Sequence, residues 1–148
     1  MEIGRRPTAG AAAFFDDVDR SFVVAQLEGR MDAPVDLTVA VRRSSPLLLE
    51  PPPGADEARR AEQLARELAT LEPRVRVAVT EEGAGEIPVF TVAGRVRFVG
   101  VPRVNLFRAL LDTIRRASTG DHGVVDEWVH ALDRLPRPVH ARVFATPT

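Results

Sequence analysis

The stretch EIPVFTVAGRVRFVGVPRVNLFRALLDTI, residues 86–114, decides the fold of this chain. Its first half predicts a β-hairpin, with strands over 88–92 and 95–99 and a turn at Ala93-Gly94. Its second half predicts an amphipathic helix over 103–118, which Gly120 ends. The apolar residues at helical spacing in that half are Leu106, Phe107, Leu110, Leu111 and Ile114.

Four elements are predicted before this stretch. An apolar stripe predicts a helix over 12–30, and the alternation in VDLTVAV (35–41) predicts a strand. A segment rich in Ala, Leu, Glu and Arg predicts a helix over 57–73 with Asp56 as its N-cap. A second strand follows over 74–80.

Two elements are predicted after it. The sequence DHGVVDEWVHALDRL (121–135) favours a further helix, capped near Asp121, and a last strand is expected over 138–145. The order of helices and strands therefore predicts an α/β domain.

The composition narrows the function classes. The chain has 148 residues, 45% of them hydrophobic, and a formal net charge of −1, so one globular domain is expected and neither nucleic acid nor a membrane is favoured as a partner. No apolar run approaches the roughly 20 residues of a bilayer span, and no secretion signal is recognisable, which predicts a cytoplasmic protein. The chain has no cysteine. Disulfides, thiolate catalysis and cysteine metal ligands are therefore excluded for this sequence.

The two ends of the chain resemble each other. APVDLTVAVRRS (33–44) and RPVHARVFATPT (137–148) both begin a predicted strand with Pro-Val, both follow a predicted helix, and are offset by 104 residues. This pattern indicates one complete domain followed by the start of a second copy. The predicted organisation is a tail over 1–14, a domain over 15–120, and the helix and strand of a truncated second domain over 121–148.

The order of elements and the stretch over 86–114 resemble the thioredoxin-like domains of the tandem protein disulfide oxidoreductases, also called glutaredoxin-like proteins. They are also similar to the N-terminal tandem domain of the alkyl hydroperoxide reductase flavoprotein. The resemblance implies a thioredoxin-like fold, with a mixed central sheet flanked by helices. The residues that match the family pattern are Arg97, Phe98, Gly100, Pro102, Phe107, Leu110, Leu111 and Ile114.

The same resemblance implies a redox site that lacks the cysteines needed for disulfide chemistry. The family's Cys-Pro-Tyr-Cys motif would fall on Ser45-Pro46-Leu47-Leu48, where only the proline matches. A serine hydroxyl cannot form a disulfide, so this is expected to be a degenerate first domain. Pro88 would be the cis-proline that presents the backbone of Ile87 to an extended substrate chain. Without the resemblance, a trans proline opening a strand is the alternative.

Other residues support weaker hypotheses. Ser45 as a nucleophile has no histidine or acid nearby in the sequence. Asp126 and His130, at helical spacing i and i+4, resemble half of a metal site, but zinc needs three or four ligands and an ion pair or solvated side chains are the alternative. We therefore expect no metal and no cofactor. Trp128 is expected at a contact between domains or in a dimer.

Two functions follow as hypotheses. The first is a redox-inactive member of the protein disulfide oxidoreductase lineage that retains a groove for an extended polypeptide near Ile87 and Pro88. The second is a non-catalytic interaction module, in which the C-terminal helix and strand pair with a second copy to form a homodimer. An enzyme that uses arginine and glutamate side chains is a third possibility, and no motif supports it. Whether the truncation before the second-domain cysteines is natural stays open.

Overall fold

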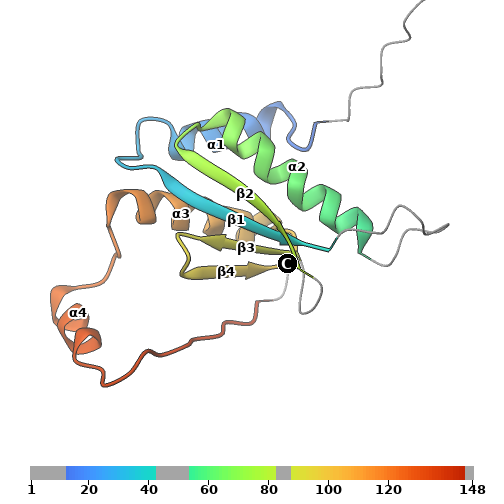
Figure 1. Ribbon diagram of the computed structural model, residues 1–148. Helices are drawn as coiled ribbons and strands as arrows, with labels where there is room; N and C mark the ends of the chain where they lie inside the picture. The colour runs from blue at the N-terminus through green and yellow to red at the C-terminus, as the bar shows by residue number, and fades with distance from the viewer. Residues whose placement is uncertain (1–12, 43–53, 83–87, 146–148) are drawn as a thin grey trace, which may run out of the picture.

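The computed structural model describes residues 13–42, 54–82 and 88–145, and Figure 1 shows the arrangement of its elements. Every helix and strand predicted before residue 120 is present, with bounds shifted by a few residues. The elements are, in order, α1 (Asp17–Leu27), β1 (Val35–Val41), α2 (Ala55–Leu71), β2 (Val75–Glu81), β3 (Val89–Val92), β4 (Val96–Val99), α3 (Val104–Thr119) and α4 (Asp126–Asp133).

The four strands form one mixed sheet in the order β2-β1-β3-β4. β1 pairs with β2 in parallel and with β3 in antiparallel orientation, and β3 pairs with β4 in antiparallel orientation. Val39, in the middle of β1, lies between Val79 of β2 and Phe90 of β3. The mixed sheet that the resemblance implies is therefore confirmed, with β1 and β3 side by side.

Three helices cover one face of this sheet (Figure 1). α2 packs on β1 and β2, α3 packs on β1 and β3, and α1 contacts both of these helices. Because strand residues alternate between the two faces, Leu37 and Val39 point to the helices while Asp36 points to the opposite face. On that opposite face Asp36 forms an exposed ion pair with Arg76 at 2.9 Å, and no described helix lies over it.

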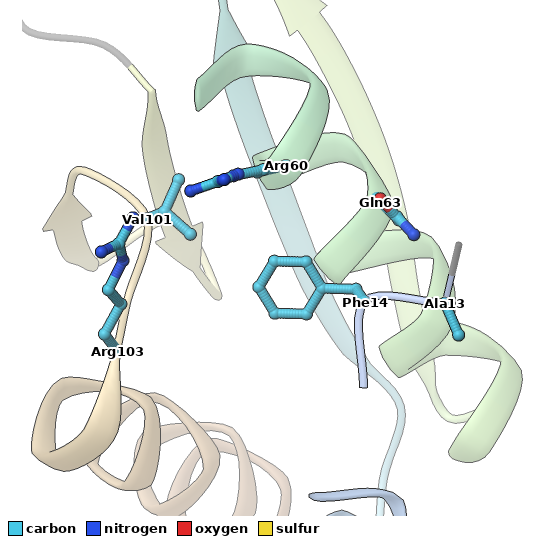
Figure 2. Close-up of a pocket in the computed structure, with 6 residues that line it drawn as sticks. All are labelled: Ala13, Phe14, Arg60, Gln63, Val101 and Arg103. Carbon is cyan, nitrogen blue, oxygen red and sulfur yellow. The ribbon is translucent and has the colours of Figure 1, made fainter. Parts of the chain in front are cut away.

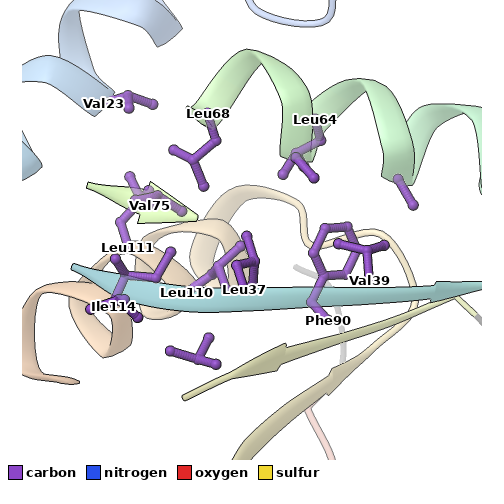
Figure 3. Packing of buried hydrophobic residues seen from close by; sticks show 14 of the residues in the cluster. Val23, Leu37, Val39, Leu64, Leu68, Val75, Phe90, Leu110, Leu111 and Ile114 are labelled. Carbon is purple, nitrogen blue, oxygen red and sulfur yellow. The ribbon is translucent and has the colours of Figure 1, made fainter. Parts of the chain in front are cut away.

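The core lies between the helices and the covered face of the sheet (Figure 3). Burying a large apolar side chain stabilises the fold by about 1.5–3 kcal/mol, so these residues supply most of the stability of the domain. The largest of the fully buried side chains are Phe90, Leu27, Leu37, Leu64, Leu68, Leu110, Leu111 and Ile114.

Two predicted turns are confirmed in detail. Ala93 and Gly94 join β3 to β4 with φ angles of 50° and 67°, and the N–H of Arg95 donates to the carbonyl of Val92 at 3.0 Å. Positive φ at both central residues is the hairpin geometry that matches the twist of the strands. Gly120 ends α3 with φ of 72°, and its N–H donates to the carbonyl of Arg116 at 2.9 Å.

Two predicted N-caps are wrong. α2 begins two residues earlier than expected, after Gly54, so Asp56 lies inside its first turn and pairs with Arg59. α4 begins at Asp126 after Val125. The carboxylate of Asp121 accepts a hydrogen bond from the N–H of Gly123 at 2.8 Å, and this local turn takes the place of the expected cap.

The predicted strand over 138–145 is also wrong, because these residues pair with no strand of the sheet. A strand depends on hydrogen bonds to a neighbouring strand, and alternation of side chains alone does not provide one. Together with α4, these residues form a segment that we call the C-terminal arm, residues 121–145. Figure 1 shows it leaving the far end of α3 and running apart from the helices. Its division into a second domain stays a prediction.

Candidate binding site at the carboxyl end of the first strand

The ends of several strands and helices lie together at one end of the sheet. β4 runs in the same direction as β1, because each is antiparallel to β3. The end of β1, the beginning of α2, the beginning of β3 and the beginning of α3 therefore lie at the same end of the domain (Figure 1). This is the end at which the sequence predicted the degenerate redox positions and the substrate-binding proline.

Pro88 is held firmly at this end. It is buried, and its carbonyl accepts a hydrogen bond from the N–H of Gly100 at 2.8 Å. Val89 pairs with Ala40, so Pro88 lies next to the last residue of β1, Val41. The other predicted site residues lie outside the described residues, and they are Ser45, Pro46, Leu47, Leu48 and Ile87.

A cleft that the sequence did not predict lies close to this end, between α2 and the segment that leads into α3 (Figure 2). Its volume is about 390 Å³. Its apolar part comes from Phe14 and Val101, and the guanidinium groups of Arg60 and Arg103 lie at its rim. Ala13 and Gln63 complete the lining. We call it the Arg60–Arg103 cleft.

The carboxylate of Glu67 holds the phenylalanine of this cleft in position. The two carboxylate oxygens accept hydrogen bonds from the backbone N–H groups of Phe14, at 2.5 Å, and Phe15, at 3.0 Å. This ties the chain before α1 to α2 and explains why α1 begins only at Asp17, five residues later than the periodicity predicted. Phe14 is thereby fixed over the cleft, with its ring against that of Phe15.

The pKa of Glu67 is set by opposing effects. Burial raises the pKa, but the hydrogen bonds from Phe14, Phe15 and Gln63, together with the charge of Arg20, outweigh it and hold the pKa below its usual value. Arg20 approaches the carboxylate at 3.8 Å. Glu67 is therefore ionised at neutral pH and acts as a fixed acceptor rather than as an acid.

The two arginines at the rim differ from most others on the helices. Arg59 pairs with Asp56, and Arg66 pairs with Glu62 one turn further along α2. Within the described part of the chain, neither Arg60 nor Arg103 has an ion-pair partner or a hydrogen bond from its guanidinium group. Two unpaired positive charges beside an apolar surface favour a ligand with an anionic and an apolar part.

The backbone directly after Arg103 is strained. Val104, which follows it and begins α3, has φ of 44°, in the left-handed region that β-branched residues rarely adopt. Arg103 itself is extended and makes no side-chain cap for α3. No signal in the sequence marks this cleft, because Arg60 is one of several arginines on α2 and Phe14 fits the apolar stripe of a helix.

The remaining predictions about sites concern α4 and the whole chain. Asp126 and His130 both lie on α4 and are exposed. Over the described ranges, no group of three or more His, Cys, Asp or Glu side chains is arranged to hold a metal ion. None of the helices in those ranges has the length and apolar character needed to cross a bilayer.

Comparison with known proteins identifies the fold. No family model matches the chain, and no curated protein matches it in sequence. Its structure is similar to that of a mutant of the alkylhydroperoxide reductase AhpF from Enterococcus faecalis (V583), with a TM-score of 0.63 at 13% sequence identity. The match covers 83% of this chain and 62% of that one. With the sheet order and the helices on one face, this similarity shows that the chain has a thioredoxin-like fold.

Proposed function

We propose that this protein is a binding module of the protein disulfide oxidoreductase, glutaredoxin-like lineage, that it acts in the cytoplasm without thiol chemistry, and that it holds an extended polypeptide at the Pro88 end of the sheet. The observation that carries the proposal is a buried Pro88, bonded to Gly100 beside the end of β1, in a chain with no cysteine. Disulfide exchange needs a thiolate, which this chain lacks. Binding of an extended chain needs only backbone groups and a shaped surface.

The absence of turnover is tested first. Insulin disulfide reduction by dithiothreitol is followed by turbidity, with and without the protein. The proposal predicts equal rates, since no side chain of the protein can form a mixed disulfide. Acceleration that scales with protein concentration would contradict it.

Binding is tested with reduced and alkylated insulin B chain, labelled with a fluorophore, as an extended polypeptide. Fluorescence anisotropy should show saturable binding, and Pro88→Ala should weaken it at least about 10-fold, which corresponds to about 1.4 kcal/mol. Pro138→Ala, in the exposed C-terminal arm, is the matched control and should bind like the original protein. Circular dichroism selects a temperature at which both variants are folded. Equal binding by Pro88→Ala and Pro138→Ala would contradict the assignment of the site.

A second candidate function is self-association through the C-terminal arm. The observation that favours it is the exposure of the large apolar side chains in this segment, which include Trp128, 65% exposed, and Phe144, 91% exposed. Large apolar side chains left exposed in one segment favour an interaction site. Multi-angle light scattering should find a dimer that dissociates on dilution. A strictly monomeric protein at all concentrations would contradict this function.

A further inference from the structure

The apolar residues of α4 form a stripe with nothing packed against it. Val125, Trp128, Leu132 and Leu135 recur at intervals of three and four residues, so they share one side of the helix and its ends. All four are exposed. We call them the α4 stripe.

Acidic groups lie on the other sides of α4. Asp126 and Glu127 lie in the first turn of α4 and Asp133 is its last residue. The three side chains are exposed, and among the described residues none of them forms an ion pair. The helix therefore presents an aromatic and aliphatic surface on one side and unpaired negative charges on its other sides, so α4 as a whole is negatively charged.

The Arg60–Arg103 cleft has the opposite character. Its apolar surface comes from Phe14 and Val101, and its rim carries two guanidinium groups without partners in the described ranges. An indole ring beside a guanidinium gains from cation–π attraction as well as from burial. The volume of the cleft, about 390 Å³, lies in the range of small binding sites.

We propose that the α4 stripe of one copy docks in the Arg60–Arg103 cleft of a second copy. Trp128 packs against Phe14 and Val101 beside the guanidinium groups of Arg60 and Arg103, and the negative charge of α4 favours its approach to these two arginines. This inference rests on the second proposed function, self-association, and names the surface that receives the helix.

The α4 stripe does not dock in the cleft of its own chain, because α4 lies at the other end of the domain (Figure 1). Arg103 precedes α3 and Gly120 ends it, and this helix of 16 residues is about 24 Å long at about 1.5 Å per residue. The connection after Gly120 turns at once. The Asp121 carboxylate accepts from Gly123 and lies 4.0 Å from the Arg116 guanidinium, so the connection stays at the far end of α3.

Each copy offers one helix and one cleft, so two copies satisfy each other in a closed, two-fold symmetric dimer. In such a dimer the same contact occurs twice. Removing the cleft or the helix from every copy removes both contacts, while mixing the two defective forms restores one of them.

The experiment uses this property with full-length variants. The cleft variant is Arg60→Glu/Arg103→Glu, and the helix variant is Trp128→Ala/Leu132→Ser. The matched control is Arg95→Glu/Arg97→Glu, which reverses two exposed arginines at the turn and on β4, away from the cleft. Sedimentation velocity is run from about 1 μM to about 1 mM, a range that covers weak dimers.

We expect the original protein and the control to dimerise, and each of the other two variants alone to dissociate at least about 10-fold more readily. An equimolar mixture of the cleft and helix variants should form a heterodimer, because one intact helix meets one intact cleft. That recovery also shows that both variants are folded.

A second arm reverses the charges on both sides. Asp126→Arg/Asp133→Arg should weaken the dimer of the otherwise unchanged protein and should strengthen association with the Arg60→Glu/Arg103→Glu variant. Dimers that persist in the cleft variant would overturn the inference while self-association stands. A protein that stays monomeric throughout would overturn both, and binding of the insulin B chain at Pro88 would remain as a separate result.

Discussion

The body of the domain, residues 13–120, and the C-terminal arm contain the same kind of amphipathic sequence with opposite outcomes. On α3 the apolar residues Leu110, Leu111 and Ile114 are fully buried against β1 and β3. On α4 the residues Trp128 and Leu132 are exposed, although they follow an equally regular spacing. An amphipathic pattern therefore shows that a helix needs a partner, but it does not say whether the same chain provides it.

A matched pair of substitutions, one in each region, should give the largest difference in the free energy of unfolding. Phe90→Ala removes a ring that is completely buried in the middle of the sheet and should lower the free energy of unfolding by about 3–5 kcal/mol. Phe144→Ala makes the same change in the arm and should alter it by less than about 0.5 kcal/mol.

Chemical denaturation followed by circular dichroism compares these two variants at a concentration at which the protein is monomeric. Equal destabilisation by the two would mean that Phe144 is buried in the folded monomer, and the contrast between body and arm would be lost.

The next largest effect on stability is expected where α2 holds the segment before α1. Glu67→Gln weakens the hydrogen bonds to the N–H groups of Phe14 and Phe15 and removes the charge that faces Arg20. Because hydrogen bonds to charged groups contribute about 1.5–3 kcal/mol and glutamine keeps one acceptor, we expect a loss of about 1–2 kcal/mol at neutral pH.

This contribution should depend on pH in a defined direction. The pKa of Glu67 is lower in the folded than in the unfolded protein, so its contribution is complete above the unfolded value of about 4.3 and disappears as the pH falls through the folded value. The difference in unfolding free energy between the original protein and Glu67→Gln should therefore be constant above about pH 5 and shrink below about pH 4. Glu57→Gln, on the exposed side of α2, is the control. A difference that grows on acidification would contradict the assignment.

An effect of similar size is expected where the end of α3 meets the segment just before β1. The hydroxyl of Ser118 is buried, accepts a hydrogen bond from the N–H of Ala33 at 2.9 Å and donates one to the carbonyl of Ala33. Ser118→Ala leaves these two backbone groups without their partner and should cost about 1–2 kcal/mol.

Ser21→Ala is the matched control, because the hydroxyl of Ser21 is exposed and bonds only to the carbonyl of Asp17. Thermal unfolding of the two variants is compared. A change of the same size in both would show that the Ser118 contact adds nothing specific to the joining of α3 to β1.

The smallest effect is expected on the face of the sheet that carries no helix. Arg76→Ala removes the ion pair with Asp36, and both side chains are mostly exposed. Exposed ion pairs contribute about 0–1 kcal/mol, so the free energy of unfolding should change by less than about 1 kcal/mol and even less at high salt. A loss above about 2 kcal/mol would show that this face is covered.

The sequence was sufficient for the elements whose partners lie in the same domain. The alternation over 35–41, the hairpin turn at Ala93-Gly94 and the end of α3 at Gly120 were all predictable, because backbone geometry and burial favour the same structure there. The thioredoxin-like order of elements followed from these.

The sequence was not sufficient where contacts between distant residues determine the structure. α1 begins late because Glu67, about fifty residues away, binds the N–H groups of Phe14 and Phe15. The residues over 138–145 alternate like a strand but have no partner strand. The Arg60–Arg103 cleft joins residues from three separate segments, which no local pattern can indicate.

The docking of α4 in the cleft is tested most directly with Trp128, which is the only tryptophan of the chain and lies in the α4 stripe. Its fluorescence emission and its quenching by acrylamide are measured while the protein is diluted, in parallel with Arg60→Glu/Arg103→Glu. We expect a protected, blue-shifted tryptophan at high concentration that becomes solvated on dilution, and a solvated tryptophan at every concentration in the cleft variant. The same concentration-dependent protection in both proteins would contradict the docking of α4 at the Arg60–Arg103 cleft.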